Sequence, residues 1–222
     1  MELNDVMRTA FSAREFTDEE LPDSVLQEIL ENARFAPSGG NRQGGRIIVV
    51  RDAATRQKLI ELTTPQACRY IAQVQAGESP YNSVNPSKVT DDDVAKIGPP
   101  DRLLGSMKGA SVILVVVVDL TVVASVDKDL DRVGMISGAS IYPLVWNVLL
   151  GARQAGYGGV LTTLPVANEP ALKALFAIPD HFAAAAVVPL GKPVKQLTKL
   201  RRLPVEELAV RECFDGEGFS AA

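Results

Sequence analysis

Apolar residues recur at helical spacing in several parts of the chain. Residues 2–11 would place on one helix face the apolar side chains of Leu3, Val6, Met7, Ala10 and Phe11. Residues 22–36, PDSVLQEILENARFA, show the same spacing, and Asp23 or Ser24 can cap the helix they predict. Residues 53–63 predict a third helix.

The second half of the chain contains two further helical patterns. Residues 131–156 are mostly small and apolar, which predicts one long buried helix. Pro143 would kink this helix, and Gly156 would end it. Residues 168–178 predict another helix, with Asn168 as its N-cap and a proline in its first turn.

Three apolar runs predict strands. They are RIIVV at residues 46–50, ASVILVVVVDL at residues 110–120 and FAAAAVVPLG at residues 182–191. The middle run is apolar at successive positions, which is typical of a strand covered on both faces. Because several connections are too short to hold a crossover helix, we expect an α+β sandwich of sheet and helices rather than a doubly wound fold.

Two segments lack this apolar pattern. Residues 77–100 are rich in Pro, Ser, Asn and Asp, and we expect a surface excursion, with a lid as one possible role. Residues 192–222 are polar and punctuated by proline, with a short helical pattern at residues 205–213. This tail has too few apolar residues to form a core of its own. We therefore expect one domain over residues 1–222 whose C-terminal arm lies along another surface, such as a second subunit.

Composition narrows the classes of function. The chain has 222 residues, of which 46% are hydrophobic, and a net charge of −4, which leaves no basic surface for nucleic acid. The single histidine, His181, argues against a histidine metal site or a Ser-His triad, and the two cysteines, Cys68 and Cys213, are far apart. The longest apolar run is too short to span a membrane, so we expect a cytoplasmic protein with no membrane partner.

Two polar clusters in the N-terminal part could carry chemistry. In RTAFSAREF, Arg8, Ser12 and Arg14 offer two guanidinium groups and a hydroxyl that suit a phosphate, although they could equally be solvated surface residues. The loop FAPSGGNRQGG has glycines that let a ligand approach the backbone, and its Asn41 and Gln43 amides suit the edge of a heteroaromatic ring. The alternative is a glycine-rich connection between a helix and a strand.

Two more clusters lie in the C-terminal half. In TKLRRLP, Lys199, Arg201 and Arg202 could hold an anion or form a basic rim that faces solvent. In YGGVLTTLP the glycines permit close backbone approach, while Thr162 and Thr163 can donate hydrogen bonds. Each cluster is a weak signal by itself.

Together, and in this order along the chain, these segments resemble the FMN-dependent nitroreductase family over essentially the full length. The resemblance is carried by RTAFSAREF, ILENARFAPSGGNRQ, ALFAIPDHFAAAAVVPLGKP and KLRRLPVEE. It implies an α+β homodimer whose C-terminal arms are exchanged between subunits, with one flavin at each side of the interface.

The resemblance also implies roles for individual residues. The flavin-binding loop would run from Pro37 to Gln43, and the segment near the flavin N5 would run from Leu161 to Thr163. The whole set of implied cofactor-binding residues is Arg8, Ser12, Arg14, Pro37, Ser38, Gly39, Asn41, Gln43, Leu161, Thr162, Thr163, Lys199, Arg201 and Arg202.

The chain departs from the family pattern at two places. Ala10 and Phe11 stand where many members carry a basic residue before the motif serine, and Arg8 is one helical turn away as a candidate replacement. The residues after Asn41 read RQGG, where the family usually has a Gln-Pro-aromatic sequence, so the pocket would be more open.

By this resemblance we expect an FMN-dependent NAD(P)H oxidoreductase. Hydride would pass from NADH or NADPH to the flavin and then, in a ping-pong cycle, to a small-molecule acceptor such as a nitroaromatic or a quinone. No catalytic side chain and no metal are required for this cycle. The alternatives are a non-catalytic flavin-binding or storage protein, a deazaflavin-using enzyme, and a dehalogenase or fragmentation enzyme on the flavin fold.

Overall fold

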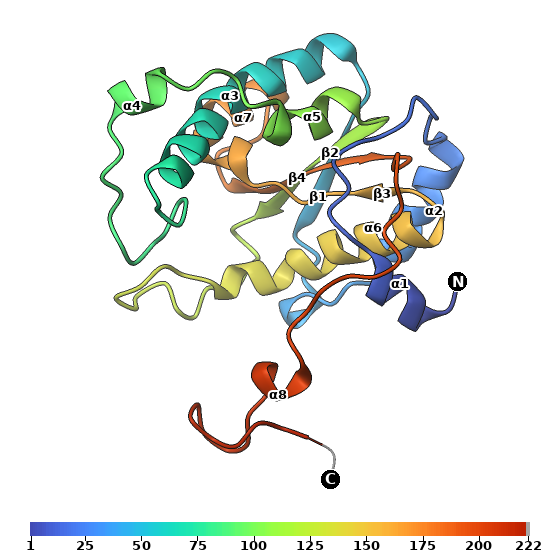
Figure 1. Cartoon of the computed structure of the whole chain (residues 1–222). Coiled ribbons are helices and arrows are strands. Elements are labelled where there is room, and N and C mark those ends of the chain that lie inside the picture. Colours follow the sequence, from blue (N-terminus) through green and yellow to red (C-terminus); the bar gives the residue numbers. More distant parts are fainter. Residues whose placement is uncertain (221–222) are drawn as a thin grey trace.

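The computed structural model describes residues 1–220 (Figure 1). Its strands are β1 (Gly45–Val50), β2 (Val112–Asp119), β3 (Gly158–Gly159) and β4 (Phe182–Gly191). Its α-helices are α1 (Leu3–Thr9), α2 (Asp23–Ala33), α3 (Ala53–Gln75), α4 (Asp91–Ala95), α5 (Asp101–Gly109), α6 (Tyr142–Gln154), α7 (Glu169–Phe176) and α8 (Val205–Leu208). Three 3₁₀ helices are η1 (Gly39–Asn41), η2 (Ile136–Ser140) and η3 (Leu164–Asn168).

One antiparallel sheet with the strand order β1-β2-β4-β3 lies between two layers of helices (Figure 1). Side chains of β2 alternate between the two faces, as the twofold period of a strand requires. Leu114 and Val116 pack with α2 and α6, whereas Ile113 and Val115 pack with α3, α5 and α7. Burial on both faces explains why β2 is apolar at successive positions, and the expected α+β sandwich is confirmed.

Two predicted helices have different lengths in the structure. The segment at residues 131–156 is not one helix: it forms loop and η2 before α6 begins at Tyr142. Pro143 therefore lies in the first turn of α6 and does not kink it. Gly156 follows the end of α6 with a φ of +83°, as expected for a glycine after a helix. Conversely, α3 continues through Pro65 to Gln75, twelve residues beyond the predicted end at residue 63.

Other local predictions also need correction. Pro22 is the N-cap of α2, and no side chain caps it, so the predicted cap by Asp23 or Ser24 is wrong. In contrast, Asn168 is the N-cap of α7 and the proline lies in the first turn, as predicted, although the Asn168 side chain makes no capping hydrogen bond. Helix α5 was not predicted. On α1 only Val6 is buried, and Leu3 and Met7 are exposed.

The residues 77–100 contain one short helix, α4, with a capping box between Thr90 and Asp93. Beside it, Glu78 accepts hydrogen bonds from the Ser87 hydroxyl at 2.6 Å and from the Lys88 N–H at 2.7 Å. This excursion is therefore fastened by side chains rather than by a sheet. Within residues 1–220 no helix is both long and apolar enough to cross a membrane.

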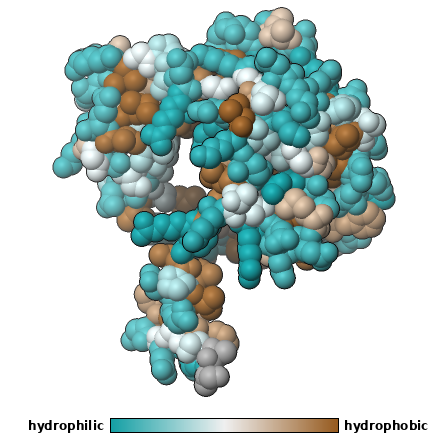
Figure 2. All heavy atoms as spheres, turned by 45° about the vertical axis from the view of Figure 1, so that its right-hand side comes forward, coloured by the Kyte–Doolittle hydropathy of each residue, from teal (hydrophilic) through white to brown (hydrophobic). Residues whose placement is uncertain are grey.

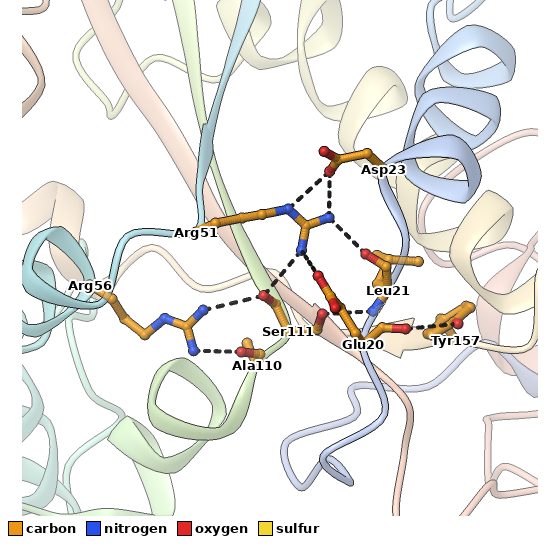
Figure 3. Close-up of polar contacts among 8 residues, drawn as sticks. All are labelled: Glu20, Leu21, Asp23, Arg51, Arg56, Ala110, Ser111 and Tyr157. Carbon is orange, nitrogen blue, oxygen red and sulfur yellow. Dashed lines mark hydrogen bonds and ion pairs between the residues drawn. The ribbon is translucent and has the colours of Figure 1, made fainter.

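A polar network surrounds Arg51, which directly follows β1, and Ser111, which directly precedes β2 (Figure 3). Arg51 pairs with Asp23 at 2.8 Å and donates to the Leu21 carbonyl at 2.7 Å. The Ser111 hydroxyl accepts from the Leu21 N–H at 2.7 Å, and Arg56 donates to the Ala110 carbonyl at 2.6 Å. These bonds tie the chain before α2 to the start of β2.

The residues just after β4 still contact the N-terminal segment, where the Val194 N–H donates to the Glu15 carbonyl and the Gln196 amide donates to the Thr9 carbonyl. The chain then leaves the body of the molecule and carries α8 away from it (Figure 1). In the space-filling view, apolar residues gather on this segment, which we call the C-terminal arm (Figure 2). Its exposed large apolar side chains are Val194, Leu197, Leu203, Val205, Leu208, Val210, Phe214 and Phe219.

Candidate functional site

A cavity of about 630 Å³, which we call the large cavity, lies beside β4 and the segment that follows β3. This volume falls within the usual range for small-molecule and cofactor sites. Four residues predicted from the sequence line it: Arg14, Leu161, Thr162 and Thr163. Other lining residues include Tyr70, Tyr81, Leu103, Ser106, Tyr142, Ala184 and Ala185.

A β-bulge shapes one wall of this cavity. The β2–β4 register shifts between Val116 and Val117, so that Ala185 has no partner on β2. The Ala185 carbonyl instead accepts a hydrogen bond from the Tyr142 hydroxyl at 3.3 Å. Beside it, the Ala184 N–H donates to Glu169 Oε1 at 2.5 Å. The bulge therefore turns this stretch of β4 toward the cavity and joins it to α6 and α7.

The segment at residues 161–163 is held along β4. Thr162 donates its N–H to the Val187 carbonyl at 2.9 Å, and its own carbonyl accepts from the Val187 N–H at 2.8 Å. Leu161 and Thr163, on either side, are both exposed and line the cavity. A ligand in the cavity would thus meet a fixed backbone, because β4 supports it from behind.

The excursion at residues 77–100 contributes Pro80 and Tyr81 to the opposite wall. The Tyr81 hydroxyl donates to Gln66 Oε1 at 2.8 Å, and Tyr81 has a φ of +55°. Burial raises the pKa of Tyr81, so its phenol stays protonated at neutral pH. The sequence does not predict Tyr70 and Tyr81 for the site: Tyr70 lies beyond the predicted end of α3 at residue 63, and Tyr81 lies in the excursion, whose side chains carry no motif.

A second, smaller cavity of about 100 Å³ lies near the N-terminal segment. It is lined by Ser12 and Arg202, which the sequence predicted, and by Arg153 and Gln196, which it did not. A parallel bridge joins Ser12 to Gly159, next to a 3.0 Å hydrogen bond from the Ala13 N–H to the Gly159 carbonyl.

Gly159 is needed for the close approach of β3 to β4. A Cβ atom there would lie 2.4 Å from the Leu190 side chain and 2.6 Å from the Pro189 carbonyl oxygen. Gly159 therefore serves packing against β4, in addition to any role toward a ligand. The preceding Gly158 serves packing against the N-terminal segment, because a Cβ there would lie 3.2 Å from the Ala13 Cβ.

The predicted loop from Pro37 to Gln43 lines neither cavity. It is nevertheless an ordered turn, with a φ of +61° at Gly40, +53° at Asn41 and +50° at Gln43. Ser38 Oγ accepts from the Gln43 N–H at 3.0 Å, and the Gln43 amide donates to Asn41 Oδ1 at 3.2 Å. Backbone in the left-handed region is costly for residues other than glycine and is concentrated at functional sites.

This loop is anchored to η2 rather than to the cavities. The Gly39 N–H donates to Ser140 Oγ at 3.1 Å. The start of η2 is held in turn by Asp127, which accepts from the Met135 N–H at 2.7 Å and from Arg132 at 2.8 Å.

The remaining predicted residues, Arg8, Lys199 and Arg201, are exposed and line neither cavity. A single chain thus groups the other predicted residues in three places: the large cavity, the small cavity and the loop. No group of three or more His, Cys, Asp or Glu side chains in residues 1–220 is arranged to hold a metal ion.

Comparisons with known proteins agree with this architecture. The model of the nitroreductase family matches residues 7–192. A NADH dehydrogenase of Thermus thermophilus is 29% identical over 199 residues, which cover 90% of this chain and 90% of that protein.

Two solved structures share the fold, although only about one residue in five is identical to this chain. Oxidised iodotyrosine deiodinase bound to FMN and 3-iodo-L-tyrosine superposes with a TM-score of 0.68 at 20% identity, covering 96% of this chain and 100% of the other. A BluB-like flavoprotein from Clostridium difficile superposes with a TM-score of 0.70 at 20% identity, with the same coverage. The fold, the order of its motifs and the extent of the family match lead to one conclusion: this chain belongs to the nitroreductase family.

Proposed function

We propose that this protein is an FMN-dependent NAD(P)H oxidoreductase that reduces a small conjugated acceptor. Membership of the nitroreductase family supports the oxidoreductase class. The flavin-dependent part of the proposal is supported by one observation: Arg14 and the segment at residues 161–163 line the same 630 Å³ cavity.

The residues present fit a flavin mononucleotide. The large cavity offers tyrosine, leucine and alanine side chains for a flat ring, and a backbone segment fixed along β4. The small cavity offers the guanidinium groups of Arg153 and Arg202 and the Ser12 hydroxyl for a phosphate. Ser12 and Arg14 flank Ala13, so one short segment would contact both parts of the cofactor.

A bound flavin would supply hydride acceptance and donation at its N5 atom. The protein's part is to bind, orient and tune. Arg14 is the one charged side chain among the described residues that line the large cavity. A fixed positive charge there would stabilise negative charge on a reduced ring, because a preorganised cation needs no rearrangement when the charge develops.

The proposal includes a homodimer with exchanged arms and a single domain in each chain. Apolar side chains on the arm, together with Leu3 and Met7 on α1 and Trp146 on α6, are exposed in one chain. Burial against a second copy would remove this apolar surface from water. The same assembly would bring the loop from Pro37 to Gln43 of one subunit toward the cavities of the other.

One observation favours a second reaction class. Pro80 and Tyr81 place the excursion at residues 77–100 on the wall of the large cavity, where it could act as a substrate-specific lid. Iodotyrosine deiodinase, which shares the fold, was solved with an iodinated aromatic amino acid. Reductive dehalogenation of an aromatic substrate is therefore the alternative to reduction of a nitroaromatic or quinone.

The test begins with mass spectrometry of the chromophore released from the purified protein, which distinguishes FMN from a deazaflavin. Anaerobic mixing with NADH and NADPH in separate experiments should then bleach the flavin absorbance, and an added nitroaromatic or quinone should restore it. A flavin that neither nicotinamide reduces would identify a storage protein. A colourless protein that takes up neither FMN nor a deazaflavin would refute the proposal.

A further inference from the structure

The small cavity is lined by a positively charged residue, Arg153, that belongs to none of the sequence motifs. Arg153, in the last turn of α6, lines it together with Arg202 from the C-terminal arm and Ser12 from the N-terminal segment. No aspartate or glutamate is among the described residues that line this cavity. Two arginine residues thus line one small space without an acidic residue among its described lining.

Arg153 is positioned by its neighbours rather than free to swing away. Its Nε donates to Thr9 Oγ1 at 2.9 Å, and Thr9 Oγ1 donates to the Asp5 carbonyl at 2.5 Å. This uses one of the five guanidinium donors. In residues 1–220 no carboxylate lies within ion-pair distance of Arg153, whereas Arg51 has two and Arg132 has one.

Two like charges at a small cavity repel each other unless an anion lies between them. Arginine is well suited to this task because its planar donors match phosphate oxygens in pairs. A cavity of about 100 Å³ leaves room for a phosphate group but not for a flavin ring. The charge, the donors and the volume therefore favour a phosphate monoester.

We infer that Arg153 is a phosphate-binding residue of this chain, which supplies from α6 the positive charge that Ala10 and Phe11 do not provide before Ser12. This inference rests on the proposed function. It differs from the sequence-based expectation that Arg8 compensates, because Arg8 is exposed and lines neither cavity.

The experiment compares the affinity for FMN with that for riboflavin, which lacks the phosphate, in the full-length protein. Arg153→Gln should reduce the ratio of FMN to riboflavin affinity by about ten- to a hundredfold, as expected for losing a charge-assisted hydrogen bond to an anion. Arg153→Lys should retain part of the preference for FMN. Arg102→Gln is the matched control, because Arg102 is exposed on α5 and lines neither cavity.

Riboflavin binding also reports on folding, so a general structural defect would lower both affinities. An equal loss of FMN and riboflavin affinity in Arg153→Gln would overturn the inference. The same holds if Arg8→Gln, and not Arg153→Gln, lowers the ratio.

A wild-type protein that binds neither flavin would refute the proposed function, and an inorganic phosphate arm would then decide the inference. Phosphate that raises the Tm of the wild type but not of Arg153→Gln would support an anion site. Equal Tm shifts in both proteins would exclude Arg153 from a phosphate site.

Discussion

The Ala13 N–H donates to the Gly159 carbonyl at 3.0 Å, and the residues on either side of Ala13 line different cavities. Ser12 lines the small cavity, and Arg14 lines the large one. This contact thus fixes the segment from which the protein would reach both the phosphate and the ring of a flavin.

Gly159→Ala should disturb this contact. The added methyl group would overlap Leu190 and the Pro189 carbonyl, and overpacking of this kind typically costs about 1–3 kcal/mol. Thermal unfolding should show a lower Tm, together with weaker FMN binding. Gly105→Ala is the control: a Cβ there meets nothing within 4 Å and lies inside α5, so it should stabilise the fold by up to about 1 kcal/mol.

Arg14→Ala should weaken FMN retention by about tenfold, since a charge-assisted hydrogen bond near the ring is lost. It should also lower the reduction potential of the bound flavin, because the large cavity would lose the one cationic side chain among its described lining residues. Equilibrium dialysis and a dye-coupled potential measurement would report the two effects. Unchanged affinity and potential would remove Arg14 from the site, and Arg102→Ala serves as the charge-matched control.

Arg51→Ala should destabilise the fold without changing the FMN preference over riboflavin. It removes the ion pair with Asp23 and the hydrogen bond to the Leu21 carbonyl, which together join the chain before α2 to the sheet (Figure 3). Loss of such a partly buried network costs about 1–3 kcal/mol in chemical denaturation. Arg34→Ala, which removes an exposed pair with Glu31 on α2, should cost at most about 0.5 kcal/mol. Equal losses in the two variants would show that the network adds nothing.

Asp127→Asn should destabilise the protein at neutral pH and much less in acid. Hydrogen bonds from the Met135 N–H and from Arg132 lower the pKa of Asp127 below its ordinary value of 3.8, although burial opposes this shift. A lowered folded-state pKa adds stability above pH 3.8, and this stability is lost as the pH falls through the lowered value.

The measurement is the Tm difference between wild type and variant across a pH series. It should be large at neutral pH and should shrink as the pH falls below 3.8. Asp129→Asn, at an exposed position two residues away, should show no such trend. A pH-independent difference would mean that the Asp127 charge does not support η2.

The sequence predicted the parts of the fold in which one local pattern dominates. The apolar run of β2 is buried on both faces, and β4 follows the same rule. The limits of helices were less predictable, because they depend on distant contacts. At residues 131–141 the Asp127 carboxylate takes the Met135 and Ile136 N–H groups, which competes with a helix. Past Pro65, burial of Ala67 and Ala72 keeps α3 helical.

The candidate site was predictable as a set of motifs but not as an arrangement. Spacing in the chain could not show that Arg14 and Ser12 line separate cavities, or that the loop at Asn41 lies apart from both. Arg153 is not predicted from the sequence, because it lies in a segment whose pattern is dominated by apolar residues. Only the structure shows that Arg153 lines the small cavity and that no acidic residue is among the described residues of that lining.

The most direct test of the account is a crystal structure of the protein saturated with FMN. We predict a homodimer with the isoalloxazine ring in the large cavity beside Arg14, the phosphate between Arg153 and Arg202, and the partner's loop at Asn41 closing over the cofactor. A monomer in which the loop contacts only solvent, or a flavin bound away from both cavities, would contradict it.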